Sequence, residues 1–288
     1  MESASVSLGS TRITAIKAGE YYPDGGCLFG VIPKDRWSKV LPSNEANRVA
    51  LNLNCYLIET GTHIVLLDTG GGSKLNFKAS LTGGLHAPVS VPDLLRQLGI
   101  DPLRVDVVIN THLHWDHCGG NGTVCQGAFE PNFPNATYYC SEGEWQHAQE
   151  MNPRDAISYD PAQFDPLIQT GQMQLVAGDF EPVPHIKMWT APGHTRDMQV
   201  VTAESNSRTF CFFSDLIPTT RHLQPGWIPA FDLYPLDSLS SKAKWLTQAA
   251  QDAWICGFPH DPVTAFGVVD GQFILTQTID FSGHTARG

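Results

Sequence analysis

The sequence of 288 residues has few basic side chains, no long apolar run and no paired cysteine motif. No stretch approaches the roughly 20 apolar residues that a membrane-spanning helix needs, so we expect no membrane contact. Residues 1–10 have neither a basic start nor a continuous apolar block, which argues against a secretory signal. We therefore expect a cytoplasmic protein, and we expect residues 1–10 to be disordered.

The shortage of positive charge excludes a further class of function. Lys and Arg number 18 against 29 Asp and Glu, a formal net charge of −11, and no basic cluster appears. A cleft that binds nucleic acid needs such clusters to contact phosphates, so we expect no nucleic-acid partner. The seven cysteines are scattered and include no Cys-x-x-Cys motif, which is typical of reduced thiols.

What the sequence does contain is a dense group of metal-binding side chains. They lie within six residues, directly after the apolar segment 105–110, which reads as a buried strand: His112, His114, Asp116 and His117. On extended backbone His112 and His114 point to the same side, so two imidazoles can bind one metal ion. Asp116 and His117 come where the chain must turn, and they can face a second ion nearby. We expect Cys118, the next residue, to be a small buried side chain rather than a reactive thiol.

Three later residues supply what this group lacks. His194 lies in a turn after the apolar segment 186–190, Asp215 ends the predicted strand 209–214, and His260 follows the apolar segment 254–259. Each ends an apolar strand, where a side chain can leave the core and enter a cleft. Five histidines and two aspartates are enough for two metal sites that share one carboxylate.

The order of these residues resembles that of the metallo-β-lactamase-fold hydrolases. The resemblance rests on His-x-His-x-Asp-His at 112–117, Gly-His194-Thr, Ser-Asp215 and His260, with Leu67-Asp68-Thr69-Gly70 as a further match. It extends from about Leu53 to about Gln277. Asp116 and Asp215, without a cysteine ligand, are similar to the glyoxalase II and acyl-homoserine-lactone lactonase branches. Segments 25–33 and 218–223 are most similar to quorum-quenching lactonases and methyl-parathion hydrolases.

This resemblance implies a fold and a metal centre. The implied fold is an α/β (α+β) αββα sandwich that forms one domain over residues 1–288. The implied cofactor is a pair of divalent ions, Zn²⁺ first, with Mn²⁺, Fe²⁺ or Co²⁺ as alternatives because no thiolate narrows the choice. By the family pattern, one ion takes His112, His114 and His194, the second takes Asp116, His117 and His260, and Asp215 bridges both.

Two aspartates carry further expectations from the resemblance. Asp116 is the expected catalytic residue: it would accept a hydrogen bond from a hydroxide held between the ions and later pass the proton to the leaving group. Asp68 is expected to hydrogen-bond the free ring nitrogen of a ligand histidine. The alternative for Asp68 is that it caps the turn at Gly70–Gly72.

The resulting hypothesis is a dinuclear metal-dependent hydrolase of a small ester, above all a lactone of the N-acyl-homoserine-lactone kind. Two ions roughly 3.5–4 Å apart can hold one hydroxide, and metal binding lowers the pKa of water to about 7. The alternatives are a thioester hydrolase of the glyoxalase II type, a phosphotriesterase, and an iron-dependent oxidoreductase on the same fold. The expected partner is a small-molecule ester or lactone, and a homodimer is an assembly to be tested.

The substrate-binding residues are predicted from two irregular apolar segments. Residues 20–48 hold aromatic and aliphatic side chains among glycines and prolines without a clear period, which fits either core packing or a lid over the cleft. The segment 218–234 follows Asp215 and is also rich in aromatic residues. From these segments we select Phe29, His222 and Trp227 as candidate substrate-binding residues, facing an apolar acyl chain.

Local patterns predict the surrounding elements. Segment 53–67 reads as a hairpin around Thr60-Gly61, and 91–98 as a helix that stops at Gly99. Ser141 with Glu144 forms a capping-box pattern that opens a helix to about Gln149. A second helix is expected from Asp237 to about Ala253, with one apolar stripe at Leu239, Ala243, Leu246 and Ala250. Strands are expected at 173–176, 187–190, 199–203 and 209–213, and a closing hairpin at Asp270-Gly271.

Overall fold

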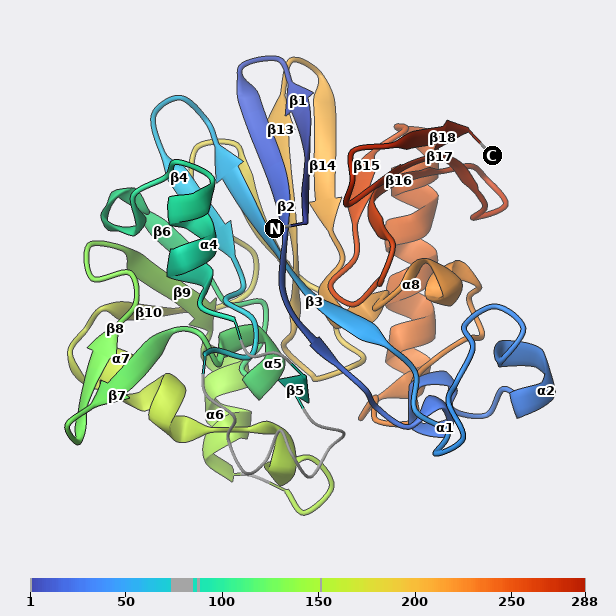
Figure 1. The fold of residues 1–288 in the computed structure, drawn as a ribbon, viewed down its shortest axis with the longest axis horizontal. Coiled ribbons are helices and arrows are strands. Elements are labelled where there is room, and N and C mark those ends of the chain that lie inside the picture. The colour runs from blue at the N-terminus through green and yellow to red at the C-terminus, as the bar shows by residue number, and fades with distance from the viewer. Residues whose placement is uncertain (1, 74–84, 87–88, 151, 288) are drawn as a thin grey trace.

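The structure, a computed structural model, describes residues 2–73, 85–86, 89–150 and 152–287, and these form two large sheets packed face to face (Figure 1). The first sheet has the order β1 (Ser3–Leu8), β2 (Thr11–Tyr21), β3 (Leu51–Glu59), β4 (Ile64–Leu67), β6 (Val107–Ile109), β9 (Thr137–Ser141) and β10 (Met173–Val176), with β5 (Leu85–His86) paired to β2. The second has the order β11 (Phe180–Val183), β12 (Ile186–Thr190), β13 (Gln199–Ser205), β14 (Arg208–Phe212), β15 (Ile255–Gly257), β16 (Thr264–Val269), β17 (Leu275–Asp280) and β18 (Thr285–Arg287). A short hairpin, β7 (Gly122–Cys125) with β8 (Ala128–Pro131), lies outside both sheets.

The core lies between the two sheets and continues on their outer faces. Strand β3 contributes side chains to the core on both faces of its sheet, because successive side chains of a strand point in opposite directions. Tyr56 and Ile58 enter the core shared by the two sheets, whereas Cys55 and Leu57 enter the core under the outer helices. A strand buried on both faces reads as a nearly continuous apolar run, as this one does.

Helices cover the outer face of each sheet, which completes the predicted αββα arrangement (Figure 1). Helices α4 (Val91–Gln97), α6 (Glu142–Glu150) and α7 (Asp165–Gln169) pack on the first sheet, and α8 (Pro235–Gln251) packs on the second. Three shorter helices are α1 (Gly25–Phe29), α2 (Lys34–Trp37) and α5 (Trp115–Cys118). Among the described residues, no helix combines the length and apolar character needed to span a membrane.

Several expected elements are confirmed, and the expected disorder of residues 1–10 is wrong. The hairpin of β3 and β4, helix α4 and strand β10 lie where the sequence predicts them. Residues 3–8, expected to be disordered, form β1, because their backbone pairs with β2 over six residue pairs and Ala4 and Leu8 enter the core. Irregular segment 20–48 contains α1 and α2 and packs as a separate apolar cluster around Phe29 and Trp37.

The long helix α8 begins earlier than expected, with Tyr234 and not Asp237 at its N-cap, and its buried face only partly matches the expected stripe. Leu246 is fully buried and Ala250 packs on the core as expected, but Leu239 is 38% exposed, and the buried face also includes Ser238, Lys242, Trp245 and Ala249. Lys242 can face inward because its ammonium donates to two backbone carbonyls, those of Gln224 and Trp227, at 3.0 and 2.8 Å. An apolar pattern in the sequence cannot predict a buried lysine, because its burial depends on hydrogen-bond acceptors that come from another segment.

Candidate metal centre

Parallel strand pairs bring the predicted ligands to one end of the sandwich. In the first sheet β4 runs parallel to β6, and in the second β14 runs parallel to β15. Carboxyl ends of parallel strands meet at one edge, so the residues that follow them become neighbours. Asp68 and His112 follow β4 and β6, and Asp215 and His260 follow β14 and β15.

Close approach of two loops fixes the turn that carries Asp116 and His117. The amide of Thr69 donates to the carbonyl of His117 at 2.7 Å, and Gly120 N donates to Gly70 O at 3.2 Å. A Cβ atom on Gly120 would lie 2.2 Å from the Thr69 carbonyl oxygen. Glycine at this position is therefore required for the loop after β4 to lie against α5.

A second glycine sets the position of His194 against helix α8. Gly193 has a φ of +152°, and a Cβ atom there would lie 2.6 Å from Ser238 Cα. The carbonyls of Gly193 and His194 accept from Tyr234 N and Leu233 N, at 2.9 and 3.1 Å. These contacts hold His194 to the segment that leads into α8.

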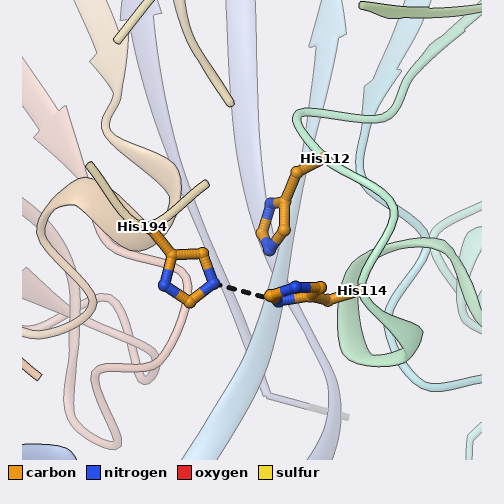
Figure 2. Close-up of side chains that lie close together, drawn as sticks. All are labelled: His112, His114 and His194. Atoms are coloured by element: carbon orange, nitrogen blue, oxygen red, sulfur yellow. Dashed lines mark hydrogen bonds between the residues drawn. The ribbon is translucent and has the colours of Figure 1, made fainter. Parts of the chain in front are cut away.

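The five histidines and two aspartates predicted as ligands converge on one buried cluster. Three overlapping groups have their potential ligand atoms within 4.8 Å of one another: His112, His114 and His194; His112, His117 and Asp215; Asp116, His117 and His260. Figure 2 shows the first group, in which three rings from two segments face a common space. His194 Nε2 lies 3.0 Å from His114 Nδ1. Two nitrogens bound at 2.0–2.1 Å to one tetrahedral ion would lie about 3.3 Å apart, so this spacing suits a shared ion.

Asp215 lies between the groups. Its Oδ1 is 2.9 Å from His260 Nε2 and 3.2 Å from His117 Nε2, and its Oδ2 is 3.4 Å from His194 Nε2. Asp116 is more peripheral, with Oδ2 at 3.7 Å from His260 Nε2 and 3.9 Å from His117 Nε2. The geometry therefore places Asp215, and not Asp116, within reach of both histidine groups.

Orientation of the rings fits metal binding. His117 Nδ1 donates to Asp68 Oδ2 at 2.8 Å, His260 Nδ1 to the carbonyl of Asn52 at 2.9 Å, and His194 Nδ1 to Asp232 at 3.0 Å. His112 Nδ1 lies 3.2 Å from the Thr111 hydroxyl. By contrast, the buried Nε2 atoms of His112, His117 and His260 have no hydrogen-bond partner. Ligand histidines in proteins are held in this way, with one nitrogen bonded to a protein acceptor and the other left for the ion.

Burial and neighbouring charges set the protonation of these groups. Burial, together with neighbouring imidazoles, lowers the pKa of His112 and His114 well below 6.5, which favours the neutral form that binds metal. Burial alone would raise the pKa of Asp215. The imidazoles of His260, His117 and His194 outweigh burial and hold that pKa well below 3.8, so the carboxylate stays ionised.

A cavity of about 510 Å³ opens onto this cluster. His114, Asp116, His194 and Asp215 lie at its base. Other lining residues come from segment 21–27, from residues 154–158 and from residues 230–231, and they include Tyr21, Pro23, Ile157, Ala230 and Phe231. Two arginines, Arg48 and Arg154, also line the cavity. Neither arginine is among the site residues predicted from the sequence. Each donates to one backbone carbonyl, Arg48 to Tyr22 at 3.1 Å and Arg154 to Ala230.

The three predicted substrate-binding residues are absent from the lining of this cavity. Phe29 and His222 are fully buried and stack on each other with ring centroids 5.0 Å apart. Trp227 meets the edge of Phe29 at 5.6 Å, and His222 Nε2 lies 3.0 Å from the carbonyl of Leu28. Their contacts indicate a structural role in supporting the α1 segment. Cys118 is also fully buried, as expected, and burial raises the pKa of its thiol well above 9.0.

Sequence reasoning missed three residues that surround the cluster. Asp232 contacts His194, Glu144 accepts hydrogen bonds from the segments of Leu113 and Thr195, and Tyr21 packs edge-on against His260 at 5.4 Å. Asp68, the one such residue that the sequence suggested, contacts His117 and accepts from Thr111 N at 2.8 Å. Asp68 has a φ of +56°, a left-handed backbone conformation that aspartate tolerates better than most residues.

Comparison with known proteins agrees with this geometry. The family model described as the metallo-beta-lactamase superfamily matches residues 49–260. A curated relative, the N-acyl homoserine lactonase of Bacillus thuringiensis, is 24% identical over 256 residues, covering 85% of this chain and 94% of the relative. A crystal structure of a probable metal-dependent hydrolase from Staphylococcus aureus has a TM-score of 0.88 and 28% identity, covering 96% of this chain and 98% of that one.

A second solved structure shows the same fold at lower identity. AidC, a dizinc quorum-quenching lactonase, has a TM-score of 0.77 and 20% identity, and the match covers 93% of this chain and 94% of AidC. The family match extends over more than half of the chain and includes every predicted ligand. This chain therefore belongs to the metallo-β-lactamase superfamily, as a metal-dependent hydrolase.

Proposed function

We propose that this protein hydrolyses a small carboxylic ester, foremost a lactone, at a centre of two divalent metal ions. The observation that carries the proposal is the set of buried Nε2 atoms on His112, His117 and His260, which have no hydrogen-bond partner. Those of His117 and His260 lie 3.2 and 2.9 Å from Oδ1 of the ionised Asp215. Unpartnered buried polar atoms are costly, and a bound cation is the partner that this donor set suits.

The residues divide into two ligand sets. His112, His114 and His194 would hold one ion, Asp116, His117 and His260 would hold the other, and Asp215 would contact both. When bound, the ions supply a Lewis acid for the ester carbonyl and a nucleophile from water at neutral pH. Nitrogen and oxygen donors suit Zn²⁺ and also admit Mn²⁺, Fe²⁺ or Co²⁺.

Asp116 is the residue best placed to move a proton. Its carboxylate side chain is 11% exposed and lines the cavity, whereas Asp215 lies deeper among the histidines. In ester hydrolysis a proton must leave the attacking water and reach the departing alkoxide. A carboxylate between the cluster and the substrate cavity can accept that proton and deliver it to the leaving group.

The cavity shape supports a substrate with an apolar part. Ile157, Ala230 and Phe231 belong to the lining, and Phe231 packs edge-on against His194 with ring centroids 5.6 Å apart. An acyl chain that enters here would lie on Phe231 while its ester carbonyl reaches the cluster. Curated relatives of this chain are named N-acyl homoserine lactonases, which makes N-acyl homoserine lactones the first substrates to assay.

A thioester hydrolase is the second candidate, and the two arginines favour it. Glutathione thioesters carry carboxylates, which guanidinium groups recognise through paired hydrogen bonds. Arg48 and Arg154 both line the cavity. The two candidates therefore differ in which part of the lining contacts the substrate.

Purified protein loaded with Zn²⁺ or Mn²⁺ should be assayed on short-chain and long-chain homoserine lactones, S-lactoylglutathione and paraoxon. We expect the highest kcat/KM on a lactone. Higher kcat/KM on S-lactoylglutathione, together with its loss in Arg48→Gln or Arg154→Gln, would favour the second candidate. Absence of turnover on every ester would refute the proposal, as would one iron per chain with oxygen uptake on a persulfide substrate.

A further inference from the structure

Glu144 is a fully buried carboxylate of α6 that lies outside the candidate ligand set. Its Oε1 accepts from the amide of Leu113 at 3.1 Å and from the hydroxyl of Tyr159 at 2.8 Å. Its Oε2 accepts from the hydroxyl of Thr195 at 2.6 Å. Within the described part of the chain, Glu144 forms no ion pair. Burying a carboxyl group costs free energy unless hydrogen-bond donors surround it. The three donors around Glu144 offset that cost, and their positions indicate what the side chain does.

The three donors belong to the three segments that surround one ligand group. Leu113 lies between His112 and His114, and Thr195 directly follows His194. Tyr159 packs against the His114 ring with centroids 4.8 Å apart, and the two residues also form a backbone bridge. One side chain therefore joins the backbone of the first sheet's motif to the turn that comes from the second sheet. Figure 2 shows the rings that these segments carry.

The other ligand group has different supports. His117 is held by Asp68 and His260 by the carbonyl of Asn52. Neither contact involves Glu144 or its donors. A change at Glu144 should therefore disturb the three-histidine group and leave the group of Asp116, His117 and His260 in place.

We infer that Glu144 is a positioning residue that sets the separation of His112 and His114 from His194. The inference rests on the proposed metal centre. Both hydroxyl donors lie within hydrogen-bond distance of the Glu144 oxygens, Tyr159 at 2.8 Å and Thr195 at 2.6 Å, so one side chain holds both segments as well as the Leu113 amide. Glutamine in place of Glu144 has the same shape, but its amide nitrogen donates and cannot accept, so the Tyr159 or Thr195 hydroxyl that faces this atom must change from donor to acceptor, which weakens that contact.

The test is a comparison of metal affinities in the full-length protein. Glu144→Gln is compared with Glu142→Gln, an exposed position in the first turn of the same helix. Stepwise Co²⁺ and Zn²⁺ affinities are measured by competition with a chelator, and the visible absorption of bound Co²⁺ reports ligand geometry. We expect one of the two ions to bind on the order of 10–100-fold more weakly in Glu144→Gln, as is typical when a residue that holds a metal ligand is lost. The second ion should be unaffected, and Glu142→Gln should match the wild type.

Two single variants, each lacking one ligand, show which ion Glu144→Gln affects. His260→Ala retains the three-histidine group, so adding Glu144→Gln should weaken the remaining ion. His112→Ala retains the other group, so the same addition should change nothing. If Glu144→Gln folds poorly, Thr195→Val removes a single arm, and its effect should vanish when Glu144 is already glutamine.

The results that would contradict the role of Glu144 differ from those that would contradict the proposed function. Unchanged affinities in both Glu144→Gln and Thr195→Val, or equal weakening of both ions, would overturn the positioning role. A wild-type protein that binds no metal would instead overturn the proposed function, independently of Glu144.

Discussion

Asp232 holds the side of His194 that faces away from the ligand cluster. Its Oδ1 lies 3.0 Å from His194 Nδ1, and its Oδ2 accepts from the hydroxyl of Ser238 at 2.6 Å. Both aspartate oxygens are thus engaged, one by a candidate ligand and one by helix α8. The turn of His194 is in this way fixed to the longest helix of the molecule.

Asp232→Ala should therefore weaken one metal ion on the order of 10–100-fold, since partners of ligand histidines commonly contribute that much to metal affinity. Asp237→Ala, an exposed position in the first turn of α8, is the matched control. Chelator competition measures both variants. Equal affinity in Asp232→Ala and the control would show that Ser238 and the Gly193 turn position His194 without the carboxylate.

The two ligand groups should lose metal differently when their members are removed. Asp215→Ala should lower the metal content for both ions, because Asp215 alone has oxygens near His117 and His260 on one side and near His194 on the other. His260→Ala should deplete mainly one ion. Metal per chain, measured by elemental analysis after extensive dialysis, reports both changes. Two ions retained in Asp215→Ala would show that Asp215 does not bridge.

The sequence predicted the ligands because chemistry and order are visible in it. Four of the seven lie within 112–117, and the others end apolar strands, so local pattern and family resemblance were enough to select them. Apart from Asp68, the residues that hold the ligands could not be predicted in the same way. Asp232 and Glu144 contact the cluster only through the packing of α8 and α6, and no spacing along the chain encodes that contact.

Glu144 also shows how a correct local pattern can point to the wrong role. Ser141 with Glu144 has the spacing of a capping box, and a helix does begin at Glu142. The Glu144 carboxylate instead faces inward to Leu113, Tyr159 and Thr195. Its full burial would have been the useful signal, and burial of a single polar residue is set by tertiary packing. Phe29 was predicted to contact substrate, but it is fully buried between Trp37 and His222 and does not line the cavity.

Acyl-chain selectivity should depend on Phe231 and not on Phe29. Phe231 lines the cavity, so Phe231→Ala should raise KM more for long-chain than for short-chain lactones, by about 0.8 kcal/mol for each CH₂ group that loses apolar contact. Phe29→Ala should lower the free energy of unfolding by about 3–5 kcal/mol, as expected for a buried phenylalanine, without selecting between chain lengths. Steady-state kinetics over a homologous series and urea unfolding test the pair. The reverse pattern, selectivity lost in Phe29→Ala alone, would return Phe29 to the substrate site.

Lys242 should make the protein's stability depend on pH. Burial lowers its pKa from 10.5 to about 7, although Asp232 opposes the shift. The nearby His222, with a pKa lowered to about 3 chiefly by burial, stays neutral above pH 7 and does not contribute. Between pH 7 and 10.5 the unfolded chain therefore binds more protons at Lys242 than the folded chain does, so stability from this group rises with pH across that window and is constant below it.

Lys242→Met should flatten that rise while lowering stability overall. Methionine cannot donate to the carbonyls of Gln224 and Trp227, and an unpaired buried acceptor costs about 1–3 kcal/mol. The informative quantity is thus the slope of the unfolding free energy against pH, which urea titrations at steps between pH 7 and 10 provide. Lys244→Met, on an exposed face of the same helix, is the control and should keep the wild-type slope. An unchanged slope in Lys242→Met would mean that the Lys242 ammonium stays protonated when buried, its charge held by the two carbonyls and Asp232.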